Sequence, residues 1–265
     1  MILKNDNYFS IEASKEYFSV SQYKSFVECE AKAMAEIRGE WEQKKTTALL
    51  VGSYVDAYFE GTLDTFKLEN PEIFKKDWTL KADYVKADEI IKRIHSDKLF
   101  MEYMSGEKQA IFTANMFGAK WKIKIDSLLP DKIVDLKVMR SLERIMGKSL
   151  ISFWKYDLQM AVYQAVYHLC TGACLDTFLA VATKEDFTDI EIIEIPKWRR
   201  LECLEEVERH LPRFIQIKQG SIEPERCGVC DYCKSTKVLT EPLDFELVGF
   251  SAHEIRAISG NINNY

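Results

Sequence analysis

The chain of 265 residues carries 42 acidic and 36 basic side chains, for a formal net charge of −6, and 47% of its residues are hydrophobic. This composition excludes a disordered or fibrous chain, and the acidic balance argues against a protein that coats nucleic acid by charge alone. The sequence has no run of about 18 apolar residues and no basic start followed by an apolar stretch, so we expect a cytoplasmic protein without a membrane span.

The pattern of apolar residues predicts an α/β fold with helices before and after a central meander of strands. Ser21 is a suitable cap for the first helix, and Phe117-Gly118 suits a tight turn. In chain order we expect helices over residues 21–40, 46–60 and 82–104, strands over 108–116, 119–129 and 133–138, a helix over 152–171, strands over 175–183 and 188–195, and a helix over 197–219. We expect one domain over residues 1–265, with the N-terminal helices packed against a cysteine-rich tail.

Two carboxylates and a lysine project from one face of adjacent predicted strands. Asp126 lies in the alternating strand over 119–129, and Asp135 and Lys137 share the polar face of the strand over 133–138. Hard cations such as Mg²⁺ or Mn²⁺ bind one or two carboxylates together with water and substrate phosphate oxygens. Such an ion activates water and stabilises charge on phosphate, and the lysine can orient that water or offset negative charge. The alternative is a solvated strand edge that carries Asp-x-Lys by chance.

Two further groups of side chains extend this set. Tyr156, Gln159 and Tyr163 fall on one face of the helix over 152–171, where Gln159 and Tyr163 can make polar contacts beside the carboxylates. Three lysines share the strand face of Asp126 and are candidate phosphate contacts, the alternative being an ordinary solvated strand face: Lys120, Lys122 and Lys124.

Taken in order, these motifs resemble the PD-(D/E)xK nuclease superfamily in its RecE-like branch, the phage and prophage exodeoxyribonuclease VIII type. The chain is more distantly similar to λ exonuclease, AddB-type nuclease domains and CRISPR-associated nucleases. The similarity covers roughly residues 21–235, and the matching pieces are residues 52–58, 107–109, 124–126, 133–137 and 156–163. It implies a restriction-endonuclease-like core, in which a central mixed β-sheet is flanked by helices.

The resemblance also implies roles for individual residues. Asp126 and Asp135 correspond to metal-binding acids, with the main-chain carbonyl of Leu136 as a further ligand, and Lys137 corresponds to the catalytic lysine. Gln159 and Tyr163 match the helix motif on the substrate side. Asp56 stands where such enzymes usually carry a histidine ligand, and we expect it to bind the metal in that histidine's place; the alternative is a polar residue of a helix face. Glu107 is an outer candidate.

Seven cysteines without a secretory signal point to reduced thiols or metal ligands rather than disulfides. Three of them are grouped at ligand spacing, Cys227, Cys230 and Cys233, and a remote Cys29 can complete a set of four. The resemblance implies a [4Fe–4S] cluster in this one-plus-three arrangement. The residues alone allow Zn²⁺ or unmetallated thiols as alternatives. We expect Cys170, Cys174 and Cys203 to be ordinary helix thiols.

The resemblance implies a Mg²⁺-dependent exodeoxyribonuclease of bacterial or phage origin that digests linear duplex DNA from its ends, 5′→3′, and leaves 3′ single strands for recombination. Double-stranded DNA ends, a single-strand annealing protein and a ring-shaped homo-oligomer are the expected partners. The alternatives are a non-catalytic DNA- or partner-binding module of the same fold, and an endonuclease or CRISPR-adaptation-type nuclease.

Overall fold

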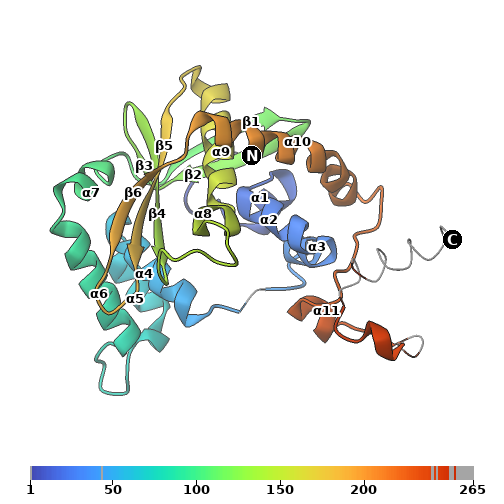
Figure 1. The fold of residues 1–265 in the computed structure, drawn as a ribbon, viewed down its shortest axis with the longest axis horizontal. Helices are drawn as coiled ribbons and strands as arrows, with labels where there is room; N and C mark the ends of the chain where they lie inside the picture. Colours follow the sequence, from blue (N-terminus) through green and yellow to red (C-terminus); the bar gives the residue numbers. More distant parts are fainter. Residues whose placement is uncertain (1, 43, 240–241, 243, 251–253, 255–265) are drawn as a thin grey trace.

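In the computed structural model, which describes residues 2–42, 44–239, 242, 244–250 and 254, a mixed sheet lies at the centre of the chain (Figure 1). Among these residues the sheet has four strands in the order β3 (Ser127–Leu128), β4 (Lys132–Met139), β5 (Asp176–Thr183) and β6 (Ile190–Glu194). β4 and β5 run parallel, whereas β3 pairs with β4 and β6 pairs with β5 antiparallel. The predicted mixed sheet is therefore confirmed.

Helices cover both faces of this sheet, because alternate residues of its strands belong to two different apolar clusters. Ile133 and Met139 of β4 join one cluster, and Val134 and Leu136 join the other. The helices on one side are α4 (Thr47–Glu60), α5 (Leu63–Glu69), α6 (Ala82–His95) and α7 (Lys98–Tyr103); those on the other are α2 (Val20–Glu28), α3 (Glu30–Arg38), α9 (Tyr156–Thr171) and α10 (Lys197–Lys218) (Figure 1).

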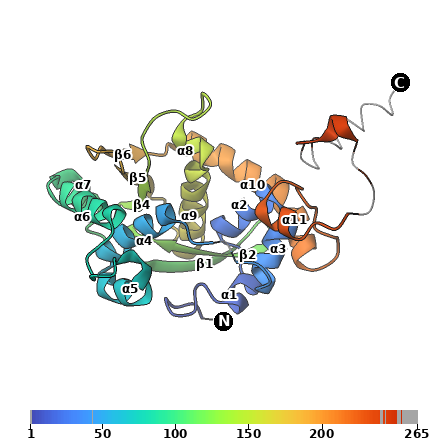
Figure 2. The ribbon, with the colours of Figure 1, turned by 90° about the horizontal axis from the view of Figure 1, so that it is seen from below.

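A hairpin of β1 (Ala110–Met116) and β2 (Ala119–Ile125) forms a two-stranded sheet of its own beside the N-terminal helices, so the strands predicted as one central meander are divided between two sheets. Its turn is Phe117-Gly118, as predicted, and both residues adopt positive φ angles, 52° and 82°, which suit the twist of a two-residue hairpin. α1 (Ile11–Glu16) and the segment before it lie along this hairpin (Figure 2), where Phe18 pairs with Trp121.

Four predicted elements are broken in the structure. The helix over 21–40 is divided at Cys29 into α2 and α3, and its cap is Ser19 rather than Ser21. The helix over 82–104 stops at His95, and Asp97 caps α7 as a new helix. The helix over 152–171 is α8 (Leu150–Phe153) and α9, separated by Lys155 in a left-handed conformation (φ 53°). The strand over 119–129 becomes β2 and β3, with Asp126 between them.

The other predicted boundaries agree with the structure to within a few residues. α1, α5 and the short helices η1 (Pro71–Ile73), α11 (Asp231–Ser235) and η2 (Phe245–Leu247) were not predicted. The part of the predicted single domain that falls on residues 251–253 and 255–265 lies outside the described residues. None of the helices described in the structure is both long enough and apolar enough to cross a membrane.

Candidate active site and cysteine cluster

A cleft of about 870 Å³ opens where the N-terminal segment, α2, α4, β2, β4 and α9 meet. Polar and aromatic side chains from all six of these segments line it. They are Tyr8, Phe9, Lys24, Asp56, Gln109, Lys122, Lys124, Asp126, Asp135, Lys137, Gln159 and Tyr163. The structure therefore brings the sequence-predicted acids, lysine, glutamine and tyrosine together in one place, from segments more than 100 residues apart.

Asp126 lies in the cleft at the break between β2 and β3. Its Oδ2 accepts a hydrogen bond from the backbone N–H of Leu136 (3.0 Å), and its Oδ1 accepts one from Gln109 Nε2 (3.3 Å). Burial, followed by repulsion from Asp135, raises the pKa of the Asp126 carboxyl to about 7. In the absence of a cation, burial and this repulsion therefore favour the protonated form of the Asp126 carboxyl.

Asp135 is held by groups from its own strand and from α9. Its side chain is 2% exposed and forms an ion pair with Lys137, which is two residues further on the same face of β4. Gln159 Nε2 donates to Asp135 Oδ1 (2.8 Å) and to the hydroxyl oxygen of Tyr163 (3.1 Å). Because 159 and 163 are one helical turn apart, α9 presents both side chains to the carboxylate.

The two remaining charges at the base of the cleft are Lys137 and Asp56. Burial alone would lower the pKa of Lys137, but the negative charges of Asp135 and Asp126 outweigh it and hold this pKa above its usual range. Asp56 reaches the cleft from the third turn of α4, and burial, followed by the charge of Asp126, raises its pKa well above the usual value. The carboxyl groups of Asp56, Asp126 and Asp135 therefore surround a single positive charge, the ammonium group of Lys137. A further positive charge is needed if all three carboxyl groups are to be ionised.

This arrangement can bind a divalent cation. The carboxylates of Asp56, Asp126 and Asp135 line one cleft, and the carbonyl of Leu136, which accepts a hydrogen bond from Lys137 Nζ (3.2 Å), directly follows Asp135 in sequence. Oxygen donors of this kind are the ligands that Mg²⁺ and Mn²⁺ take in proteins. A cation here would also relieve the repulsion that raises the pKa values of Asp56 and Asp126.

The three lysines of β2 do not form one open face, contrary to the sequence-based expectation. Lys120 lies outside the cleft and pairs with Glu16 (2.9 Å). Lys122 is 4% exposed and donates to the backbone carbonyl of Tyr8, because the N-terminal segment crosses the strand at this point. Lys124 lines the cleft and lies 4.9 Å from the centre of the Phe9 ring. Of the three, Lys124 is therefore the one best placed to meet a phosphate.

Sequence reasoning missed several residues that line the cleft. Tyr8 and Phe9 come from the unpredicted N-terminal segment, and Lys24 comes from α2, where it donates to the carbonyl of Trp154 (2.9 Å). Glu107 is exposed and does not line the cleft, whereas Gln109, two residues later, reaches Asp126 from a positive φ of 55°. These contacts depend on tertiary packing, so the sequence carries no local signal for them.

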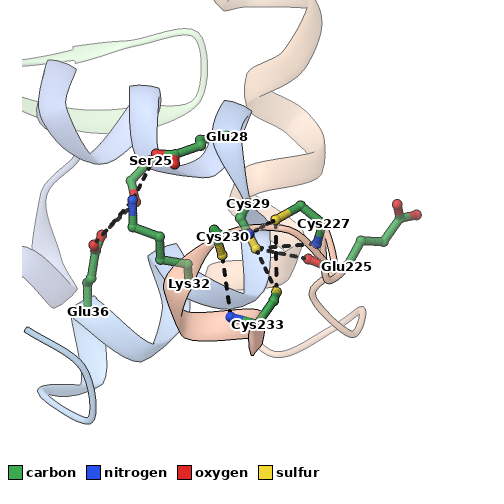
Figure 3. A network of polar contacts seen from close by, with 9 residues as sticks. All are labelled: Ser25, Glu28, Cys29, Lys32, Glu36, Glu225, Cys227, Cys230 and Cys233. Carbon is green, nitrogen blue, oxygen red and sulfur yellow. Dashed lines mark hydrogen bonds and ion pairs between the residues drawn. The ribbon is translucent and has the colours of Figure 1, made fainter. Parts of the chain in front are cut away.

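A second set of side chains lies away from this cleft, beside α3 and α11. One ligand atom from each of Cys29, Cys227, Cys230 and Cys233 lies within 4.8 Å of the other three (Figure 3). The remote Cys29 is thus brought to the other three, as the sequence suggested. The remaining thiols are elsewhere: Cys203 is buried in α10, Cys170 is exposed near the end of α9, and Cys174 follows α9 rather than lying on a helix.

A mixed sheet covered by helices on both faces, with Asp126 at a strand break and Asp135 and Lys137 on β4 at one cleft, is consistent with a restriction-endonuclease-like fold. The chain belongs to the family described as a PDDEXK-like domain of unknown function, DUF3799, whose model matches residues 19–236. This places it in the PD-(D/E)xK superfamily.

One solved structure is very similar to this chain. It is the crystal structure of a "Putative exonuclease" from Eubacterium rectale, with 47% sequence identity and a TM-score of 0.91 over 94% of this chain and 99% of the other. The structure of SSO0001 matches at 15% identity and a TM-score of 0.33, over 84% of this chain and 96% of that one, and this similarity is too low to support an argument. No curated protein matches.

Proposed function

We propose that the protein is a Mg²⁺- or Mn²⁺-dependent exodeoxyribonuclease that degrades linear double-stranded DNA from its ends. The observation that carries this proposal is the meeting of Asp126, Asp135 and Lys137 at the base of one cleft, in a chain of the PD-(D/E)xK superfamily. The 47% identity to the Eubacterium rectale protein described as a "Putative exonuclease" supports it. The acids Asp56, Asp126 and Asp135, together with the Leu136 carbonyl, are the proposed metal ligands.

The reaction is hydrolysis of a phosphodiester, in which a water oxygen attacks phosphorus and the bond to the leaving oxygen breaks. A bound cation would lower the pKa of that water and stabilise charge on the phosphate. The raised pKa of Lys137 keeps its amine protonated, which favours a role in offsetting negative charge over a role as a base. Gln159 holds the Asp135 carboxylate in place by donating to it, and the Tyr163 hydroxyl accepts a second hydrogen bond from the same Gln159 amide.

The substrate side of the cleft suits a nucleic acid. Lys24 and Lys124 supply positive charge beside the acids, and the Phe9 ring, 76% exposed at the rim, offers a surface on which a base can stack. Digestion in the 5′→3′ direction, 3′ single-stranded products used in recombination, a ring-shaped homo-oligomer and a single-strand annealing protein as partner belong to this proposal through the family resemblance alone. So does the organisation of the chain as one domain.

The test compares release of nucleotides from linear duplex DNA with release from the same DNA as a covalently closed circle, each with Mg²⁺ and with chelator. We expect metal-dependent digestion of the linear form only. Strands labelled at the 5′ or 3′ end report the direction. Asp135→Asn is the inactive control, because its neutral amide keeps the shape of the side chain and removes the charge. Cutting of closed circles would favour an endonuclease, and binding of DNA ends without hydrolysis would favour a non-catalytic module.

A further inference from the structure

We propose that Cys29, Cys227, Cys230 and Cys233 hold a single tetrahedral Zn²⁺ ion instead of the iron–sulfur cluster that the family resemblance implies. The argument rests on how close the four sulfur atoms lie, on the backbone groups that surround them and on the segments they join. It does not depend on the nuclease activity proposed above.

The spacing of the sulfur atoms fits one shared ion. Zn²⁺ binds thiolates at about 2.3 Å, so sulfurs at the corners of a regular tetrahedron around it are about 3.8 Å apart. The Sγ of Cys233 lies 3.6 Å from that of Cys29 and 3.9 Å from that of Cys227, and one ligand atom from each of the four residues lies within 4.8 Å of the others. In a four-iron cluster each thiolate binds a different iron, and the inorganic core keeps the thiolates further apart.

Backbone N–H groups point at three of the four sulfurs. Cys227 N donates to Cys29 Sγ (3.5 Å), Cys230 N to Cys227 Sγ (3.4 Å) and Cys233 N to Cys230 Sγ (3.4 Å). The loop that makes these contacts turns at Gly228, whose φ of 81° favours a residue without a side chain. Such donors offset the negative charge of four thiolates around one dication and fix the directions of the ligands. The loop therefore has the form of a built ligand site.

Two of the four cysteines are shielded from solvent, and Cys227 and Cys230 are half-buried. Cys29 and Cys233 are 3% and 2% exposed, and they pack with Ala31 and Tyr232 in a small apolar cluster of their own. The side chain of Lys32 starts beside this cluster and turns its ammonium group toward Glu28 (2.8 Å) and Glu36 (3.9 Å) (Figure 3). A four-coordinate thiolate site without an open position is the form that structural zinc takes.

The ion would join two parts of the chain that are about 200 residues apart. Cys29 is the junction of α2 and α3, and the tail also reaches this junction through Ala31 N to Glu225 O (3.0 Å) and through Glu225 N to Glu30 Oε2 (2.7 Å). α2 in turn carries Lys24 into the catalytic cleft. Because a site of this kind forms only in the folded chain, metal binding adds to the free energy of unfolding.

The experiment measures zinc, iron and acid-labile sulfide in full-length protein made under anaerobic conditions with iron and zinc both supplied. We expect one zinc per chain, no sulfide and a colourless sample. Replacement of zinc by Co²⁺ should produce the visible bands of a tetrahedral thiolate complex. Iron with sulfide in equal amounts and a brown sample would overturn the proposal, as would protein that is folded and free of metal.

Cys29→Ser is expected to lose the bound zinc and to lower the Tm by roughly 10 °C or more. Cys170→Ser is the matched control, since Cys170 is exposed and outside the cluster, and it should keep both zinc and Tm. If Cys29→Ser does not fold, the wild-type protein still decides: a thiol-blocking reagent should release one zinc as four thiols react. Because none of these readouts uses DNA, the zinc site and the nuclease proposal can fail separately.

Discussion

Metal-free protein is expected to lose stability as the pH rises from 5 to 8, because of Asp126. Its pKa is about 7 in the folded protein against a usual value of 3.8, so the folded state binds the proton more tightly than the unfolded state. The stabilisation that this proton gives the folded state is complete below the pKa that Asp126 has in the unfolded chain. It disappears as the pH rises through the pKa of Asp126 in the folded protein. Each pH unit well inside this range contributes about 1.4 kcal/mol, and the contribution fades around the folded pKa, which gives roughly 2.5–3 kcal/mol from pH 5 to pH 8.

For a chain of this size, that free energy corresponds to a fall in Tm of roughly 6–12 °C. Thermal unfolding in the presence of chelator, followed from pH 5 to pH 8, measures it as the difference between the wild type and Asp126→Asn, which has no proton to lose. Asp186→Asn, an exposed carboxylate away from the cleft, should follow the wild type. Mg²⁺ at pH 8 should raise the Tm of the wild type but not that of Asp126→Asn. Identical pH profiles for wild type and Asp126→Asn would refute the reasoning.

Further outcomes follow from the same cleft. Lys137→Met should lower turnover by about 10²–10³-fold with little change in DNA affinity, and a loss confined to binding would contradict its placement beside the reacting phosphate. Asp56→His should keep metal-dependent activity with a changed preference between Mg²⁺ and Mn²⁺, measured by titrating each ion; an unaltered preference would argue against Asp56 as a ligand. Phe9→Ala should weaken binding of single-stranded ends about 5- to 100-fold by fluorescence anisotropy, whereas Phe187→Ala, also exposed, should not.

The sequence predicts most of the individual helices and strands well because burial on a regular element repeats with a fixed period, whereas the mixed sheet between helical layers was implied by the family resemblance. In β4, alternation alone assigns Val134 and Leu136 to one face and Asp135 and Lys137 to the other. The same periodicity is silent about which distant segments meet. Tyr8 and Lys24 enter the cleft through tertiary packing, so no local pattern reveals them. For Lys122 the pattern is misleading: its place in the strand alternation predicts an exposed side chain, but the N-terminal segment covers it.

The places where periodicity fails have a common physical basis. At Asp126 the strand is interrupted, and the Asp126 carboxylate accepts the N–H of Leu136 that a continued antiparallel ladder would give to a backbone carbonyl. At Cys29 the backbone becomes extended (φ −163°, ψ 109°), yet Cys29 N still donates to Ser25 O and Cys29 O still accepts from Ala33 N. Both breaks therefore keep the backbone hydrogen-bonded while they turn a side chain out of the repeat.

A break of this kind aims one side chain at a target that a regular element cannot reach, which is the usual reason for a local irregularity to persist in a folded chain. Asp126 is turned toward Asp135, and Cys29 toward Cys233. The break at Ser96 has no such target, because Asp97 simply caps the next helix. Substitutions at the three breaks should therefore have different effects. Asp97→Ala should remove only a helix cap and cost about 1 kcal/mol of stability. A substitution at Asp126 should remove a proposed ligand of the divalent cation, and one at Cys29 a proposed ligand of the zinc.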